Sequence, residues 1–323
     1  MQFNRYLTYR KSSSVIHYWP WVLKIGLAAG AFYYVASKLW AEQVYLNKVA
    51  ALFATSEFAA LCLIITTLMS LNWLLESKKW QLLAKQVQPI SIGQAFKAIL
   101  TGVLFDTIMP FGVGAVSSKV LSLTQGNRSL VVGPVIMAQG VQSLWTVLFG
   151  LVGLVQLAKM TTIGAIYGKQ TNLLVLLVLF AALILIAIKF WPQKAKNYVD
   201  AIKKVSNIIW LKIIGLSFLR YIIFLVQLML LALYLAPQIP WVVLLGCITW
   251  MFFAKTIVPK PGHLGALGIR GASVIFFLSL AGYPSAGIVL ATLILWVINL
   301  AIPSLAGLFF IKNLSLNPEV SND

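Results

Sequence analysis

Residues 173–188 read LLVLLVLFAALILIAI, sixteen consecutive positions without a polar side chain. A strand of a membrane β-barrel alternates lipid-facing and lumen-facing residues in pieces of about ten, so this run excludes a barrel. With the positions beside it, the run reaches the roughly 20 residues that a helix needs to cross the hydrocarbon core. Backbone polar groups in lipid must be satisfied within the segment, and the run therefore predicts a membrane-spanning helix.

The rest of the chain has the same character. Of its 323 residues, 60% are hydrophobic and 10% are charged, whereas a soluble domain is about 45–50% apolar and about 25% charged. We therefore expect an all-α integral membrane protein, a polytopic helix bundle of about six to eight spans. Cys62 and Cys247 each lie in an apolar run and are interpreted as packing residues, not as a redox pair or metal ligands.

The predicted spans follow the apolar runs. They cover residues 18–40, 57–75, 129–158, 172–191, 208–236, 241–258 and 285–311, with a short apolar helix at 272–282. A basic segment, 1–17, precedes the membrane domain 18–312, and a polar tail, 313–323, follows it. The first run has no cleavage signature and is expected to be a retained span.

Lysine and arginine gather in residues 1–17, 78–85 and 194–204. Because basic loops stay on the cytoplasmic side, we expect a bacterial inner-membrane protein with its N-terminus in the cytoplasm. The net charge of +18 then serves topology and contact with anionic headgroups. Membrane lipids are the expected partners, and nucleic acid is not.

Two segments interrupt the pattern of spans. Residues 94–127 contain an apolar stretch that breaks at Pro110, Gly112 and Gly114, and residues 259–271 are again rich in proline and glycine. Such segments are typical of broken or re-entrant helices, which survive at membrane depth only when covered by protein or lining a cavity. Their matching places in the two halves favour an inverted repeat, and paired interruptions point to a transporter's binding site.

Arg220 lies near the middle of the predicted span 208–236. A central arginine is costly unless it is paired or faces a wet cavity, so we expect it to face the bundle interior. It shares a stripe with Lys212 and Gln227, within about 80° on a helix. Two interpretations stay open: contact with an anionic headgroup, or a structural ion pair with Asp106 or Glu76.

Other polar residues also lie inside apolar runs. Asp106 is interpreted as a proton or cation site, as the counter-ion of Arg220, or as a capped acid beside the helix break. The residues Asn72, Glu76 and Lys79 share one helix face and are interpreted as an interfacial salt bridge, with a functional role as the alternative.

One face of the predicted span 129–158 is polar. It carries Gln139, Gln142, Ser143 and Thr146. Such residues form hydrogen bonds between membrane helices, and the alternative is that they line a cavity.

The second interrupted segment offers groups for binding an anion. Glycines let backbone amides approach a phosphate closely, and a helix N-terminus favours negative charge. The candidate residues are Lys260, Gly262, Gly265, Gly268 and Arg270, and the alternative is a plain connector. His263 has no second ligand near it, and no catalytic triad, nucleotide loop or carboxylate pair occurs. We therefore expect no cofactor, no metal and no enzyme active site.

Three segments resemble the flippase-like family that contains the transmembrane region of lysylphosphatidylglycerol synthase. Trp73–Leu83 is similar to the family's basic and aromatic end of an early helix. Gly102–Leu121 resembles its broken Pro-Gly segment, with Lys119 as the basic residue that follows. Pro261–Gly282 resembles its Gly-rich segment before an arginine, here Arg270. The resemblance covers roughly residues 20–312.

The chain departs from the family pattern at several charged positions. Gly271 stands where the family has an acid after the arginine, and Gln139 and Gln142 stand near its usual acid-base pair. A basic residue of the last helix is replaced near Trp296. No aminoacyl-transferase domain follows the membrane region, so we expect no lipid aminoacylation by this polypeptide.

The resemblance implies a lipid-handling transporter, flippase-like, for an amphiphile with an anionic or polar headgroup. Arg220, Asp106 and Arg270 would line its cavity. Two alternatives belong to other classes. One is an accessory or scaffolding subunit that binds envelope-biosynthesis proteins, and the other is a membrane-embedded enzyme acting on a lipid-linked substrate.

Overall fold

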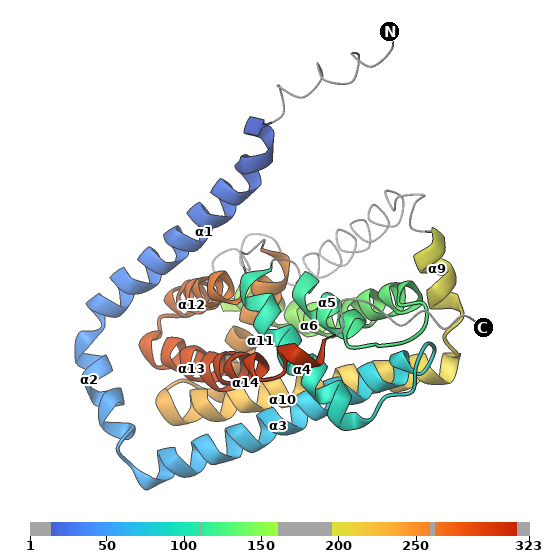
Figure 1. Cartoon of the computed structure of the whole chain (residues 1–323). Coiled ribbons are helices and arrows are strands. Elements are labelled where there is room, and N and C mark those ends of the chain that lie inside the picture. Colours follow the sequence, from blue (N-terminus) through green and yellow to red (C-terminus); the bar gives the residue numbers. More distant parts are fainter. Residues whose placement is uncertain (1–13, 110–111, 161–195, 259–261, 315–323) are drawn as a thin grey trace.

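The computed structural model describes residues 14–109, 112–160, 196–258 and 262–314. These residues form helices joined by short turns, with no strand among them (Figure 1). The helices are α1 (Ser14–Ala41), α2 (Gln43–Leu52), α3 (Ser56–Ala84), α4 (Ile92–Ile108), α5 (Val113–Leu121), α6 (Ser129–Met160), α9 (Lys196–Lys203), α10 (Asn207–Leu235), α11 (Trp241–Ile257), α12 (Gly262–Ala281), α13 (Ala286–Trp296), η3 (Val297–Ala301), α14 (Ile302–Leu308) and η4 (Ile311–Asn313). The predicted span 172–191 and Lys260 lie outside the described residues.

Four of the described helices are long and apolar enough to cross a membrane. They are α3, α6, α10 and the continuous helix Ala286–Leu308, while α11 and α12 are shorter apolar helices. The predicted all-α polytopic membrane fold is confirmed. One boundary was wrong: the span expected at 57–75 continues to Ala84, because the polar residues taken for its end are buried by neighbouring helices.

Polar caps fix where several helices begin. The Thr55 hydroxyl accepts a hydrogen bond from Phe58 N at 3.2 Å at the start of α3. At α4, Ser91 Oγ accepts from Gln94 N while Gln94 Oε1 accepts from Ser91 N, a reciprocal capping box. Each cap satisfies an amide that the first turn would leave unpaired. The sequence thus sets these helix starts locally, before any packing.

The helix α10 packs against α3, α6, α11 and α13 and runs antiparallel to α3. Near its end, Tyr234 Oη lies 2.7 Å from Thr55 Oγ1. Further back, Gln227 Nε2 donates to the Ile65 carbonyl at 2.8 Å, and Arg220 meets Asn72. The two helices lie side by side along their length (Figure 1).

The two halves of the chain repeat the same helix lengths. Both α3 and α10 have 29 residues, and both α4 and α11 have 17. The helices α4 and α11 both end at an extended residue, Met109 and Val258. Each precedes a proline, and proline disfavours the helical conformation of the residue before it. With the antiparallel run of α3 and α10, these matches fit the inverted repeat that the sequence favours.

The bundle has two distinct ends. At the end that we call the α9 end, Gln88 bonds to Thr124, and α9 packs on α6 close to Gly133. At the opposite, α2 end, the Glu42 carboxylate accepts hydrogen bonds from Ser285 N, Ser285 Oγ and Ala286 N. This carboxylate therefore caps α13 and fastens the junction of α1 and α2 to it.

The last membrane helix contains a π-helical turn, η3. Before it, α13 packs on α10, and after it, α14 packs on α4. Within the turn, Asn299 Nδ2 donates to Gln227 Oε1 at 2.8 Å, and the Gln227 amide returns a bond to Asn299 Oδ1 at 3.2 Å. The two buried amides satisfy each other between apolar helices, where an unsatisfied polar group is costly.

Candidate functional site

A cavity of about 610 Å³ lies beside the ends of α4 and α11, and α3, α5, α6 and α10 also contribute to its lining. The end of α4 and the start of α5 form one wall, and the last turn of α11 forms another. Its charged and polar lining residues are Glu76, Lys79, Asp106, Lys119, Gln139, Gln142, Ser143, Thr146, Arg220, Lys255 and Thr256. Four cations face two carboxylates there, which leaves an excess of two positive charges.

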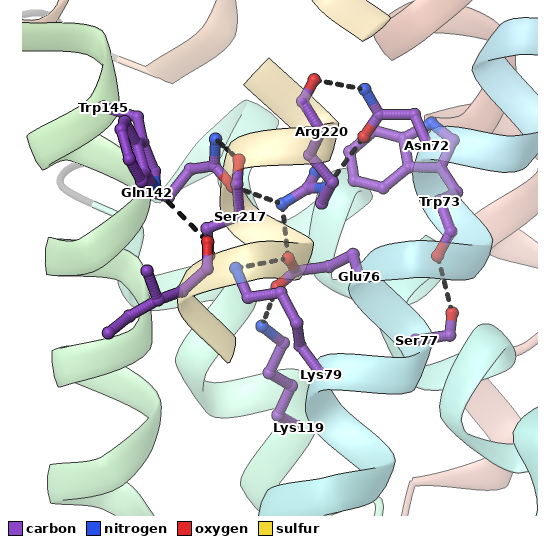
Figure 2. A network of polar contacts seen from close by, with 11 residues as sticks. Asn72, Trp73, Glu76, Ser77, Lys79, Lys119, Gln142, Trp145, Ser217 and Arg220 are labelled. Atoms are coloured by element: carbon purple, nitrogen blue, oxygen red, sulfur yellow. Dashed lines mark hydrogen bonds and ion pairs between the residues drawn. The ribbon is translucent and has the colours of Figure 1, made fainter. Parts of the chain in front are cut away.

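Glu76 organises the cationic wall of the cavity. Its Oε2 lies 3.1 Å from Lys79 Nζ and also accepts a hydrogen bond from Arg220 Nη1. Its Oε1 accepts from Lys119 Nζ. At most 10% of each of these side chains is exposed. One carboxylate is therefore shared by cations from α3, α5 and α10, whose side chains point toward one another in Figure 2.

Arg220 is held by a set of neutral partners as well. Its Nε donates to Asn72 Oδ1 at 2.8 Å, and Gln142 Oε1 lies 3.4 Å from Nη1. The guanidinium also lies over the Trp73 ring, 5.5 Å from the ring centre. A planar guanidinium gains from both in-plane acceptors and an aromatic face. The expected placement of Arg220 in the bundle interior is confirmed (Figure 2).

The ion pair of Arg220 is with Glu76, one of the two partners that the sequence left open. Asp106 also lines the cavity, but its Oδ1 accepts the backbone amide of Ala115 at 2.9 Å. The N-cap residue of α5 is Gly112, with φ of 73°, which has no side chain to offer. Asp106 thus supplies the cap that α5 lacks, as the capped-acid interpretation expected.

The polar face of α6 lines the cavity. Gln139, Gln142, Ser143 and Thr146 all contribute to its wall. Gln142 also bonds to α10, because its Nε2 donates to the Ser217 carbonyl at 3.1 Å. Both interpretations of this face therefore hold for Gln142, which links two helices and borders the cavity.

The Gly-rich segment is not the open turn that we expected. The helix α12 begins at Gly262, so Gly265 and Gly268 lie inside it and their amides are not presented as a phosphate cradle. A Cβ on Gly268 would lie 3.3 Å from Ala31, which shows that this glycine lets α1 pack closely. Among the described residues, α11 ends at Ile257 and α12 begins at Gly262.

Two other candidate residues are not among those that line the cavity. Arg270 is 7% exposed, but it is not among the residues that line the cavity. Its Nε has no hydrogen-bond partner within the described residues. Lys212 is exposed, whereas Arg220 and Gln227 of the same helix are buried.

The sequence interpretation did not place the buried acid Glu76 and the lysines in the cavity. Asn72, Glu76 and Lys79 were interpreted as interfacial, yet they are 1%, 7% and 2% exposed. Their spacing of four and three residues places them on one face of α3, and that face was the available signal. The contributions of Lys119 and Lys255 depend on tertiary packing and carry no such signal. Within the described residues, no group of three His, Cys, Asp or Glu side chains forms a metal site.

Comparison with known protein families gives a match over residues 21–307 to the family described as the lysylphosphatidylglycerol synthase TM region. The match covers most of the chain. This protein belongs to that family. Neither the curated proteins nor the solved structures gave a match.

Membership of the lysylphosphatidylglycerol synthase TM family identifies a multi-pass membrane protein and suggests lipid-related processes. Two of the three family-like segments meet at the cavity. The first contributes Glu76 and Lys79, and the second contributes Asp106 and Lys119. No residue of the third segment is among those that line the cavity.

Proposed function

We propose that this protein is a flippase-like transporter that moves an amphiphile with an anionic headgroup across the membrane. The observation that carries the proposal is the cavity between the two helix breaks, with four cations against two carboxylates. Charged groups inside a membrane protein are costly and commonly mark a substrate path. A headgroup phosphate would reduce the positive excess of the cavity.

The cationic wall is suited to such a headgroup. Arg220 offers a planar set of donors that matches two phosphate oxygens at once, while Lys79 and Lys119 act as compact charges. Glu76 holds the three cations together. An arriving phosphate would compete with Glu76 for their donors, which makes binding reversible, as a transporter requires.

The orientation belongs to the same proposal. Lys85, Arg128, Lys203 and Lys204 lie at the α9 end, together with the start of α10. By the positive-inside tendency this end faces the cytoplasm. We propose that the N-terminus lies on this side as well, in the cytoplasm of a bacterium, with the protein in the inner membrane.

Transport by Arg220→Lys in proteoliposomes tests the proposal. The substitution keeps the charge beside Glu76 and loses the planar fork, so the variant is expected to fold and to translocate poorly. A loss of about tenfold corresponds to one charge-assisted hydrogen bond. Fluorescent phosphatidylglycerol is the probe, and Lys212→Ala, at an exposed position of the same helix, is the matched control.

Three outcomes are informative. Poor transport by Arg220→Lys with normal transport by Lys212→Ala supports the proposal. Normal transport by both variants leaves a transporter in which Arg220 is structural. Wild-type protein that neither binds nor moves any headgroup contradicts the proposal and favours the accessory-subunit alternative.

A further inference from the structure

A second, apolar hollow of about 410 Å³ lies between α1, α11 and α12. We call it the groove. Its lining residues are Ala31, Trp250, Phe253, Ala254, Ile257, Val258, Ile269, Ala272, Ser273 and Phe276. None of them is charged, in contrast to the cavity.

The chemistry of the groove suits a hydrocarbon chain. Trp250 packs against Phe253 and Phe276, with ring centres 6.1 and 6.2 Å apart. The hydroxyl of Ser273 donates to the Ile269 carbonyl at 2.6 Å, so its donor is already used within α12. The other polar side-chain atom of the lining, Trp250 Nε1, is buried and has no hydrogen-bond partner within the described residues. A charged group placed there would therefore lose its hydration and gain at most one donor.

The groove adjoins the cationic cavity at one place, the last turn of α11. Lys255 and Thr256 line the cavity, and Phe253 and Ala254 line the groove. Ile257 and Val258 line both hollows. The helix ends there because Val258 precedes a proline and takes an extended conformation. A polar compartment and an apolar compartment therefore share a wall of two residues.

The wall formed by α1 is fixed in place by close packing. A Cβ on Gly271 would lie 2.7 Å from a methyl group of Val35, and one on Gly268 would lie 3.3 Å from Ala31. Small residues at these two positions let the backbones of α1 and α12 approach, as in other membrane helix pairs. The groove is thus bounded by residues of three helices, one of which, α1, is packed closely on α12.

We propose that the groove binds an acyl chain of the same amphiphile whose headgroup occupies the cavity. This inference rests on the proposed function and adds where the lipid enters, between α11 and α12 beside α1. A lipid of the surrounding bilayer could lie against any apolar face of the bundle. Beside Ile257 and Val258, however, one molecule can place its headgroup among cations and its chain among aromatic rings.

Photo-crosslinking in liposomes tests the inference directly. The probe is phosphatidylglycerol with a diazirine on one acyl chain, and the labelled residues are found by mass spectrometry. We expect labelling of Ala272, Ser273 and Phe276, and a clear fall of this labelling in Lys119→Gln, which removes a cation from the cavity. Labelling at Leu211, which is 70% exposed on α10, is the internal control and should not change. Groove labelling that is as insensitive to Lys119→Gln as that of Leu211 would overturn the inference.

Filling the groove gives a second test. Ala272→Trp should reduce translocation of two-chain phosphatidylglycerol by about tenfold or more, because each methylene that loses its apolar site weakens binding roughly fourfold. Binding of water-soluble glycerol phosphate to the cavity should not change. The matched control is Ala59→Trp, on an exposed face of α3, which should transport normally.

The two proposals fail in different ways. Wild-type protein that does not bind glycerol phosphate and does not transport contradicts the cavity as a headgroup site. Normal transport by a folded Ala272→Trp variant, with glycerol phosphate still bound, contradicts only the groove. If Ala272→Trp does not fold, the crosslinking of the Lys119→Gln variant decides.

Discussion

Glu76 shows how one acid can determine the character of a membrane cavity. Three cations that approach each other in a low-dielectric interior repel strongly. Sharing one carboxylate lowers this repulsion and still leaves the group positive. The sequence predicts the interior position of Arg220 from the cost of a central arginine, but it does not choose between Glu76 and Asp106. The sequence allows either acid to pair with Arg220. The packing of α3 against α10 decides in favour of Glu76.

We expect Glu76→Gln to destabilise the protein by about 3–5 kcal/mol, because Lys79, Lys119 and Arg220 would stay buried without their shared counter-charge. Glutamine has nearly the same shape as glutamate, so the loss of stability measures the effect of removing the negative charge. Thermal unfolding in detergent, followed by tryptophan fluorescence, measures the effect.

Glu57→Gln, at the exposed start of α3, is the control and should unfold within about 0.5 kcal/mol of wild type. Added phosphatidylglycerol should stabilise Glu76→Gln more than wild type, since its phosphate can take the place of the carboxylate. Unchanged unfolding of Glu76→Gln would mean that the cations are neutral or hydrated in the folded protein.

At the scale of helices, the breaks were the most predictable feature. Prolines and glycines predict both helix breaks, and the C-cap residues of α4 and α11 both directly precede a proline. The predicted extent of the second break was too long, because glycine serves close helix packing as well as turns. Gly268 serves packing and Gly112 serves the turn, and composition alone does not separate these two uses.

The hairpin of α4 and α5 depends on Gly114. A Cβ there would collide with the backbone of Phe105 and Asp106, so we expect Gly114→Ala to force the two helices apart. The expected loss of stability is about 1–3 kcal/mol, the usual result of overpacking. Gly140→Ala in α6 is the matched control, because nothing lies within 4 Å of its added Cβ.

Thermal unfolding compares the two alanine variants directly. Gly140→Ala should match wild type or exceed it slightly, since alanine is the better helix former. Equal unfolding of both variants would show that α5 shifts without cost and does not depend on close packing against α4.

At the scale of the whole molecule, the two ends of the bundle make opposite predictions for labelling in intact cells. In a background of Cys62→Ser and Cys247→Ala, we expect Pro284→Cys, at the α2 end, to react with an impermeant maleimide. Thr124→Cys, at the α9 end, should react only after the membrane is opened. The reverse pattern would show that the N-terminus faces outward.

The membrane class and most of the spans follow from the sequence because hydrophobic length is a local property. The cavity follows only in part. Arg220 and Asp106 line it as expected, and Gln139 and Gln142 line it as the alternative interpretation of their helix face had it, whereas Arg270 is not among the lining residues. Which face of a broken helix meets the cavity depends on its rotation, and an almost uniformly apolar helix gives little sign of that rotation.

The π-helical turn η3 has a consequence for how the two halves are joined. A π turn holds one residue more than an α turn, so everything after it is advanced by about 100° around the helix axis. This rotation lets one continuous helix pack against both halves of the chain. Its first part, α13, packs on α10 of the second half, and its last part, α14, packs on α4 of the first half. Gly307, whose Cβ would collide with the Leu100 carbonyl, faces α4 only in this advanced phase. The last membrane helix therefore connects the two halves, and the extra residue of its π turn sets the rotation between the face that packs on α10 and the face that packs on α4.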